Sequence, residues 1–403
     1  MRHLEQPCLR PGLAAAVDTG DPRFVVLWDQ LRLSRQPQRL SILEFAWLQL
    51  FDGRHSLRDV QAAAMRHLDG QLLPFELFTG LVEKLDEALF LEGPRFRDRL
   101  TSPIREPSCI GCYEGDPDAL REQITELFAG AGCPGLPEPR QPDGRLRAAL
   151  IPHIDYERGG KTFAWGFKEV AERSDAALFV IIGTSHYSSH RYTLTRKDFQ
   201  TPFGVVPTDQ TYIDRLVAHY GDGLFDDELC HLPEHSIELE VVFLQYLYQG
   251  KRPIRIVPLV VGPFQDSVEA GSLPSFREDI GRMIEALRKT EAETPEPICT
   301  IISGDLAHIG PKFGDPEPVA EPLLVLSRAQ DLALMKQAEA VDTAGYFRII
   351  AEEADHRRIC GLPPTYTVLE AVQPSRGKLL HYDQYVHPEK FESVSFASMA
   401  FYR

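Results

Sequence analysis

The sequence predicts an α/β protein whose main domain is a three-layer α/β/α sandwich with a mostly parallel central sheet, preceded by a small winged-helix domain. Two observations predict the sandwich: four short, almost continuously apolar segments between residues 146 and 304, and amphipathic helical segments between them. Strands that are apolar along their whole length are buried on both faces, which is typical of a parallel sheet covered by helices. A third observation, three helical patterns before residue 100, predicts the smaller domain.

The smaller domain is expected over residues 20–100. It opens with a segment that alternates like a strand or hairpin, continues through three helical patterns, and closes with a short strand at 89–93, LFLEG. Ser56 and Asp59 form a capping box at the start of the second helical pattern. Three helices that end in a β-wing describe a winged helix. The layout resembles the PqqD-like peptide chaperones, which hold a precursor peptide for a radical enzyme.

The main domain is expected over residues 108–403, after a linker at 101–108. Its first helix covers residues 116–128, because Asp116 can cap it and Pro117 suits the first helical position. A Pro/Gly-rich loop follows, and then strands and helices alternate. The strands are expected at 146–151, 176–183, 254–262 and 298–304, and the helices at 159–172, 208–220, 234–248 and 276–289.

Composition excludes several function classes. The 43 basic and 59 acidic residues give a net charge of −16 without any basic block, so nucleic acid is not expected as a partner. The longest apolar runs are far shorter than the roughly 20 residues of a membrane span, so no membrane association is expected. The N-terminus lacks the apolar core of a signal peptide, and the seven cysteines are scattered, so we expect a cytoplasmic protein.

Cys109 and Cys112 form the only C-x-x-C pair. A structural zinc site would need a second pair or two histidines at short spacing, and neither follows. Two ordinary loop cysteines are therefore favoured over a metal-binding or redox pair, and the sequence leaves the choice open.

Polar residues follow three of the four predicted strands. The segments are PHIDY at 152–156, GTSHY at 183–187 and SGDLAH at 303–308. Between the last two, EHSIE places Glu234 and His235 at the start of a helix. Because ligands bind beyond the carboxyl ends of the strands in such sheets, we expect these segments to meet at one rim and to share a site.

The residue types of this rim favour metal chemistry. Imidazoles with a carboxylate suit a divalent transition metal, and two histidines plus one carboxylate is the ligand set of non-haem Fe(II) oxygenases. A histidine that is not a ligand can move protons, because its ordinary pKa lies near neutrality. The chain has no Gly-rich phosphate loop and no G-x-S-x-G elbow, which argues against nucleotide and α/β-hydrolase chemistry.

A family resemblance covers residues 108–403. The segments PHIDY, GTSHY, TPFGVVPTD, EHSIELEVVFLQYL, IVPLVVG, SGDLAH and CGLPP resemble, in this order, the signature segments of the Memo family. The earlier GCYEGDPDALREQI is similar to that family's opening segment. The resemblance implies a fold similar to the class III extradiol dioxygenases, with a metal pocket at the sheet rim. Resemblance to the bacterial AmmeMemoRadiSam type of this family implies two partners, a radical-SAM enzyme and an AMMECR1-type protein.

Carried over to this chain, the family's first two histidines fall on His153 and His186. These two residues and Asp305 are the expected metal ligands. The expected acid–base or orienting residues are His235, His308 and Glu234. The expected cofactor is a divalent metal, with iron the first choice.

One departure weakens the metal assignment. Some relatives place a metal-binding cysteine where this chain has Ala307, which cannot coordinate an ion. Arg358 and Cys360, in the C-terminal segment RRICGLPP, are expected to shape the backbone.

Two function hypotheses follow. The first is a metal-dependent oxidoreductase with a dioxygenase-like fold. The second is a non-catalytic adaptor whose rim pocket binds a peptide or small molecule while the winged helix presents a substrate to a radical-SAM enzyme. Ala307 favours the second, since the loss of a ligand is a usual route from enzyme to pseudoenzyme. A DNA-binding regulator is disfavoured by the acidic charge.

Overall fold

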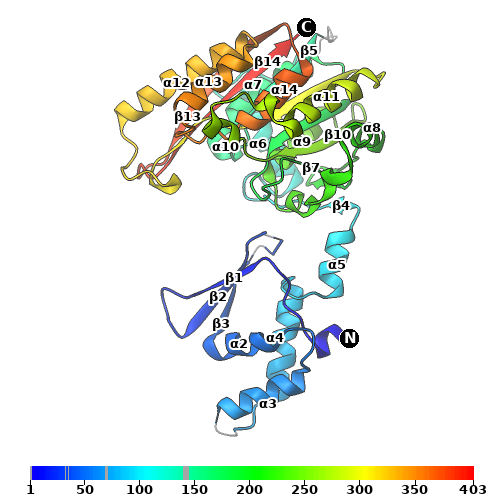
Figure 1. Ribbon diagram of the computed structural model, residues 1–403, viewed down its shortest axis with the longest axis vertical. Helices are drawn as coiled ribbons and strands as arrows, with labels where there is room; N and C mark the ends of the chain where they lie inside the picture. Colours follow the sequence, from blue (N-terminus) through cyan, green and yellow to red (C-terminus); the bar gives the residue numbers. More distant parts are fainter. Residues whose placement is uncertain (1, 32, 35, 69–70, 139–144) are drawn as a thin grey trace. The chain divides into compact units, whose positions relative to one another are not determined.

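The computed structural model describes residues 2–31, 33–34, 36–68, 71–138 and 145–403 (Figure 1). The chain divides into two compact units, Met1–Pro103 and Ile104–Arg403, and each is described by itself.

The N-terminal unit combines a small antiparallel sheet with short helices. Its strands pair in the order β1-β2-β3, so that β1 and β3 are the edges. The helices pack their apolar faces onto one side of this sheet around Leu40, Val60 and Phe78. The elements are α1 (Arg2–Glu5), β1 (Leu13–Val17), β2 (Phe24–Asp29), β3 (Gln38–Ser41), α2 (Ile42–Trp47), η1 (Leu48–Leu50), α3 (Leu57–His67), α4 (Phe75–Glu87) and α5 (Pro94–Thr101).

Within this unit, the capping box of α3 is confirmed, because the Ser56 hydroxyl accepts from Asp59 N and the Asp59 carboxylate accepts from Ser56 N. The prediction of a β-wing after the helices is wrong. In the described residues the segment 89–93 forms no strand: Leu91 makes a single bridge to Leu9, and Leu89 has a left-handed φ of 61°. The expected strand before the helices is found as β2, and the described strands of this unit all precede its main helices.

The second unit is built on a large mixed sheet. Its strand order is β12-β14-β5-β11-β6-β10-β7, and β13 pairs with β14. The four strands expected from the sequence are β5 (Leu146–Ile151), β6 (Leu178–Thr184), β10 (Arg255–Val261) and β11 (Ile298–Ser303), and they are parallel to one another as expected.

The strands outside these four run antiparallel, so the sheet is parallel only at its centre. These strands are β7 (Tyr192–Leu194), β12 (His308–Ile309), β13 (Arg376–Val386) and β14 (Ser393–Tyr402). A separate small sheet contains β4 (Ile104–Arg105), β8 (Asp198–Thr201) and β9 (Gly204–Val206).

Two apolar cores, one on each face of the large sheet, confirm the three-layer α/β fold. Along β6, Val180 and Ile182 join one core, and Phe179 and Ile181 join the other, as the two-residue period of a strand requires. One core includes side chains of α8, α11, α12, α13 and α14, and the other includes side chains of α6, α7 and α9. Figure 1 shows these helices around the central strands.

Five of the helices of this unit, α6, α7, α8, α9 and α11, agree with the expected ranges to within three residues, whereas α10, α12, α13 and α14 were not predicted. The α-helices are α6 (Pro117–Ala129), α7 (Tyr156–Arg173), α8 (Gln210–Tyr220), α9 (His235–Tyr248), α10 (Gln265–Ala270), α11 (Glu278–Ala292), α12 (Glu321–Glu339), α13 (Thr343–Glu352) and α14 (Leu362–Val372). The 3-10 turns are η2 (Asp222–Phe225), η3 (Glu228–His231), η4 (Pro274–Phe276) and η5 (Pro311–Phe313).

Gly183 allows α9 to approach the end of β6. A Cβ at this position would lie 2.6 Å from Ser236 Oγ and 3.1 Å from Ile237 Cδ1. We expect Gly183→Ala to lower the free energy of unfolding by about 1–3 kcal/mol, because the helix must shift to admit the methyl group. Denaturant unfolding would measure the loss. Gly223→Ala is the control, since its Cβ would meet only Asp226 Oδ2 at 3.4 Å; equal effects of the two substitutions would contradict the prediction.

Candidate metal centre

Three histidines meet at the carboxyl ends of the parallel strands. His153 follows β5, His186 follows β6, and His235 is the first residue of α9. Because β5 and β6 both pair with β11, their ends lie at the same rim. One possible ligand atom from each histidine lies within 4.8 Å of those of the other two. The ring centroids are 5.0 Å apart for His153 and His186, 5.3 Å for His153 and His235, and 4.5 Å for His186 and His235.

Glu234 fixes the orientation of His186. Its carboxylate lies 2.9 Å from His186 Nδ1 and also accepts from the backbone N–H of His186 at 2.7 Å. Because a carboxylate only accepts, Nδ1 carries a proton and donates it, so Nε2 is the nitrogen that can bind an ion once the ring is neutral. Glu234 also caps α9 by accepting from the N–H groups of His235 and Ser236, and its Oε1 lies 3.4 Å from His235 Nδ1.

Ser303 fixes the orientation of His153 in the same way. The Ser303 hydroxyl donates to the carbonyl oxygen of Ser236 at 2.6 Å, so it can only accept from His153 Nδ1, which lies 3.3 Å away. His153 Nε2 is therefore unprotonated. Hydrogen bonds to Nδ1 that free Nε2 are typical of the histidines that bind metal ions in proteins.

The charges around the three rings differ. Burial lowers the pKa of His153 well below its ordinary value. Burial acts in the same direction on His186, but the Glu234 carboxylate and Cys360 outweigh it and raise the pKa of His186 well above its ordinary value. Burial would raise the pKa of Glu234, but His186 and His235 outweigh burial and hold that pKa far below its ordinary range. The site thus contains one buried carboxylate, Glu234, that is ionised beside the histidines.

Asp305 lies beside this group and not within it. Its Oδ1 accepts from the backbone N–H of His153 at 3.0 Å, and its Oδ2 lies 3.8 Å from His153 Nε2. Burial raises the pKa of Asp305 to about 7. The sequence predicts a ligand role for Asp305 and an acid–base role for His235, whereas the structure gathers His235 with His153 and His186.

His308 also lies outside the three-histidine group. Its Nδ1 is 3.0 Å from the carbonyl oxygen of Leu306 and 3.1 Å from that of Arg358. Two carbonyl acceptors require an N–H at Nδ1, and burial lowers the pKa of His308 to about 4, so the ring is neutral. Ala307, before it, is buried in the core and its backbone N–H donates to Ser395 Oγ.

Cys360 is the site residue that the sequence analysis missed. Its Sγ lies 3.3 Å from His153 Nε2, although 207 positions separate the two residues. The sequence predicted only a backbone-shaping role for Cys360, and not its contact with His153. A cysteine just before Gly361 was the available signal, but no spacing rule connects a residue of this loop to a strand end so far away in the sequence.

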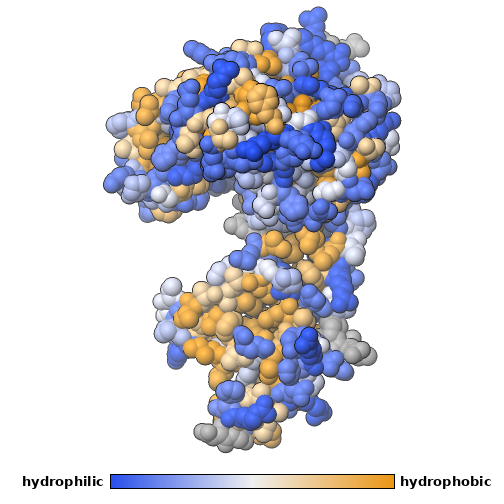
Figure 2. Space-filling view, in the orientation of Figure 1, coloured by the Kyte–Doolittle hydropathy of each residue, from blue (hydrophilic) through white to orange (hydrophobic). Residues whose placement is uncertain are grey.

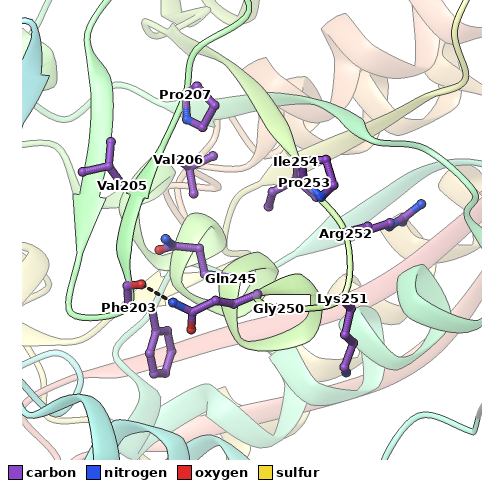
Figure 3. Close-up of a pocket in the computed structure, with 11 residues that line it drawn as sticks. Phe203, Val205, Val206, Pro207, Gln245, Gly250, Lys251, Arg252, Pro253 and Ile254 are labelled. Atoms are coloured by element: carbon purple, nitrogen blue, oxygen red, sulfur yellow. Dashed lines mark hydrogen bonds between the residues drawn. The ribbon is translucent and has the colours of Figure 1, made fainter.

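A separate pocket of about 520 Å³ lies at the other end of α9 (Figure 3). It is lined by residues of β9, by Gln245 and Gln249 near the end of α9, and by the loop that leads into β10. Gln249 donates to the carbonyl oxygen of Phe203. Since α9 is 14 residues long, about 20 Å separates this pocket from His235. The pocket is thus distinct from the histidine group.

None of the helices in the described part of the chain is long and apolar enough to cross a membrane.

Comparison with known proteins gives one consistent result. The model of the family described as "Memo-like protein" matches residues 105–400. A MEMO1 family protein of Aquifex aeolicus is 26% identical over 368 residues, which cover 88% of this chain and 90% of that protein. This coverage exceeds the length of the α/β unit, so the similarity extends into the N-terminal unit.

Two further relatives agree. A MEMO1 family protein of Methanopyrus kandleri is 29% identical over 74% of this chain and 99% of that protein. A MEMO1 family protein of Thermotoga petrophila is 31% identical over 51% of this chain and 70% of that protein.

Proposed function

The chain belongs to the Memo-like protein family, and from this premise we propose that it is a metal-dependent oxidoreductase with a dioxygenase-like fold that acts on a small molecule or a peptide. The single observation that carries the proposal is the group formed by His153, His186 and His235 at the sheet rim. A reducing compartment, the cytoplasm, suits its seven free cysteines.

The donor set fits a divalent transition metal. The hydrogen bonds of Ser303 and Glu234 hold Nδ1 of His153 and of His186, so Nε2 of each ring is the nitrogen that can bind an ion. His186 would release a proton when the ion binds, and imidazole nitrogens suit iron, zinc, copper and nickel. We propose iron as the ion. A bound Fe(II) with open positions supplies the redox chemistry used by non-haem iron oxygenases.

The neighbouring groups would orient the ligands and handle protons. Glu234 holds His186 and the start of α9. Asp305 Oδ2, at 3.8 Å from His153 Nε2, is placed to accept or return a proton next to the ligand group. His308 presents a neutral ring whose Nε2 remains able to accept a proton. These assignments keep His308 and Glu234 as supporting residues and move His235 to the ligand set.

Elemental analysis of the full-length protein, purified without oxygen, tests the proposal. We expect stoichiometric iron in the wild type and its loss in the His153→Ala/His186→Ala variant, because two of three imidazole ligands are removed. His219→Ala is the control, since this histidine lies in α8 and pairs with Glu293. Unchanged metal content in the double variant would show that the rim does not bind the ion.

A second candidate function is favoured by the N-terminal unit. We propose as the alternative a peptide-binding adaptor that works with a radical-SAM enzyme and an AMMECR1-type protein. The edge strand β1, LAAAV, carries no charged residue, and Figure 2 shows apolar side chains gathered on this unit. Uncharged edge strands can accept a peptide as an added strand. The exposed apolar residues of the unit include Val17, Trp28, Ile42, Leu43, Leu72 and Leu77.

Co-purification of the full-length chain with a radical-SAM enzyme of the same organism tests the alternative. A charge on the edge should block strand addition, so Val17→Lys should abolish the complex while Val325→Lys, an exposed position on α12, should not. A stable complex without metal would favour the adaptor over the enzyme. Equal binding by both variants would exclude β1 as the docking edge.

A further inference from the structure

Cys109 and Cys112, which form the C-x-x-C pair, lie at the two ends of a tight turn. The backbone N–H of Cys112 donates to the carbonyl oxygen of Cys109 at 2.8 Å, and Gly111 has the positive φ, 109°, that a type II turn requires at this position. A β-turn brings the Cα atoms of its end residues within about 7 Å of each other. The Cα atoms of disulfide-bonded cysteines are usually about 4.4–6.8 Å apart. The turn therefore places the two cysteines at a separation that a disulfide can span.

This turn is fixed to two helices and remains open to solution. The backbone N–H of Cys109 donates to the Glu238 carboxylate of α9 at 3.2 Å. The carbonyl oxygen of Cys112 accepts from the backbone N–H of Tyr156, the first residue of α7, at 2.9 Å. Both cysteine side chains pack against the apolar core on this face of the sheet, but neither is fully buried, and Ile110 between them is exposed. A small molecule can thus reach the thiols while the backbone of the turn stays in place.

The two thiols differ in acidity. A hydrogen bond from the Cys109 thiol lowers the pKa of Cys112, with help from Arg158 and against burial, Asp155 and Glu238. Burial raises the pKa of Cys109 well above its ordinary value, and the interactions with Cys112 and Glu238 add to this effect. Thiol–disulfide exchange uses such a pair, because a thiolate makes the first attack and a second thiol close by completes the reaction.

The structure gives this pair no further ligands for a metal ion. In the described part of the chain, the group of three possible ligands is that of His153, His186 and His235, and it includes neither Cys109 nor Cys112. A structural zinc site needs four ligands. In reducing compartments, disulfides are usually transient and take part in catalysis or redox sensing. A redox role therefore suits the pair better than a zinc site.

We propose that Cys109 and Cys112 form a redox-active dithiol that reduces disulfides of the glutathione class. The Cys112 thiolate attacks one sulfur of the disulfide, whose S–S bond breaks, and the first glutathione leaves as a thiolate. Cys109 then loses its proton and attacks the Cys112 sulfur, and the second glutathione leaves from the mixed disulfide. Two electrons pass from the cysteines to the disulfide, and the two protons that the cysteines release are taken up by the two glutathione thiolates. The proposal does not depend on the metal site.

Mass spectrometry of the full-length protein tests the proposal. The reduced protein is treated with excess glutathione disulfide, with a metal chelator and without oxygen, and the remaining thiols are then blocked with iodoacetamide. Trypsin, which cleaves after Arg105 and Arg121, releases residues 106–121, a peptide with both cysteines of the pair and no other. We expect this peptide to lose two hydrogen atoms and to resist iodoacetamide, and reduced glutathione should reverse the change. Cys133, a partly buried cysteine outside the pair, is the internal control and should form at most a mixed disulfide.

Two variants test the order of attack. In Cys109→Ser no second thiol can displace the glutathione bound to Cys112, so the peptide should keep one glutathione. In Cys112→Ser the peptide should stay reduced. Glutathione kept in Cys112→Ser but not in Cys109→Ser would overturn the assigned order. A wild-type peptide that stays reduced, or that keeps glutathione on both cysteines, would overturn the whole proposal, and this result does not depend on how the variants fold.

Discussion

Glu238→Gln is expected to lower the free energy of unfolding by about 3–5 kcal/mol, because it leaves a buried guanidinium without its counter-ion. The side chains of Arg105 and Glu238 form an ion pair that is fully buried. The same carboxylate accepts from the hydroxyl of Tyr113 and from the backbone N–H groups of Ser108 at 2.8 Å and Cys109 at 3.2 Å. Glutamine would bring an N–H₂ group to face these donors. Denaturant unfolding at pH 7 would measure the loss, and an effect below about 1 kcal/mol would contradict the argument.

The stabilisation that the Glu238 carboxylate provides should decrease as the pH falls. Burial would raise the pKa of Glu238, but Arg105 and the other donors outweigh burial and lower it to about 2. A carboxyl whose pKa is lowered on folding stabilises the protein above its ordinary pKa near 4.5, and the stabilisation disappears as the pH falls from there toward 2. The difference in stability between wild type and Glu238→Gln should therefore shrink between these two pH values.

Glu240, two residues further along α9, provides the control. Its carboxyl oxygens have no hydrogen-bond partner among the described residues, and burial raises its pKa well above the ordinary value despite the nearby Ser303. A raised carboxyl pKa destabilises the folded state as the pH rises above 4.5, by up to about 1.4 kcal/mol per pH unit. Glu240→Gln should thus stabilise the protein at pH 7 and have little effect at pH 4.

Glu234→Gln is expected to weaken metal binding by about 10- to 100-fold, the usual effect of removing a hydrogen-bond partner of a metal-binding histidine. The carboxylate accepts from both the side chain and the backbone of His186, so an amide would place one donor against another. The ring of His186 would lose its fixed orientation, and the start of α9 would lose its cap.

Competition of each variant with a chelator of known zinc affinity would measure the change. Glu285→Gln, at an exposed position of α11, is the control and should bind as the wild type does. Thermal unfolding of the metal-free proteins should accompany the titration, so that loss of the helix cap is measured separately. Equal affinities of Glu234→Gln and the control would exclude the orienting role.

The sequence was most informative where one local pattern determines one element. Almost continuously apolar segments located β5, β6, β10 and β11, and the histidines that follow β5 and β6 were placed at the same rim because parallel strands end on the same side. The same reasoning found the start of α9 and its histidine.

Other elements depend on distant partners and could not be predicted. The sequence of β14 is SVSFASMAFY, and its serines and alanines interrupt the continuous run of large apolar residues that marks a buried strand. All ten residues of β14 are nevertheless buried. Its antiparallel pairing with β5 turns the expected parallel sheet into a mixed one. Cys360 reaches the site through the close contact of Gly304 with Gly361, which no periodicity signals. The expected wing at residues 89–93 is not formed, because Leu89 has a left-handed backbone conformation and Leu91 makes only a single bridge, to Leu9.

The position of β14 bears on how the protein is made in the cell. β5 pairs with β11 on one side and with β14 on the other, and about 240 residues separate β5 from β14 in the chain. While the ribosome makes the intervening residues, the outer edge of β5, an almost entirely apolar strand, has no native partner. Open apolar edges invite pairing with other chains. Nascent chains of this protein should therefore depend on molecular chaperones until residues 393–402 emerge and close the sheet.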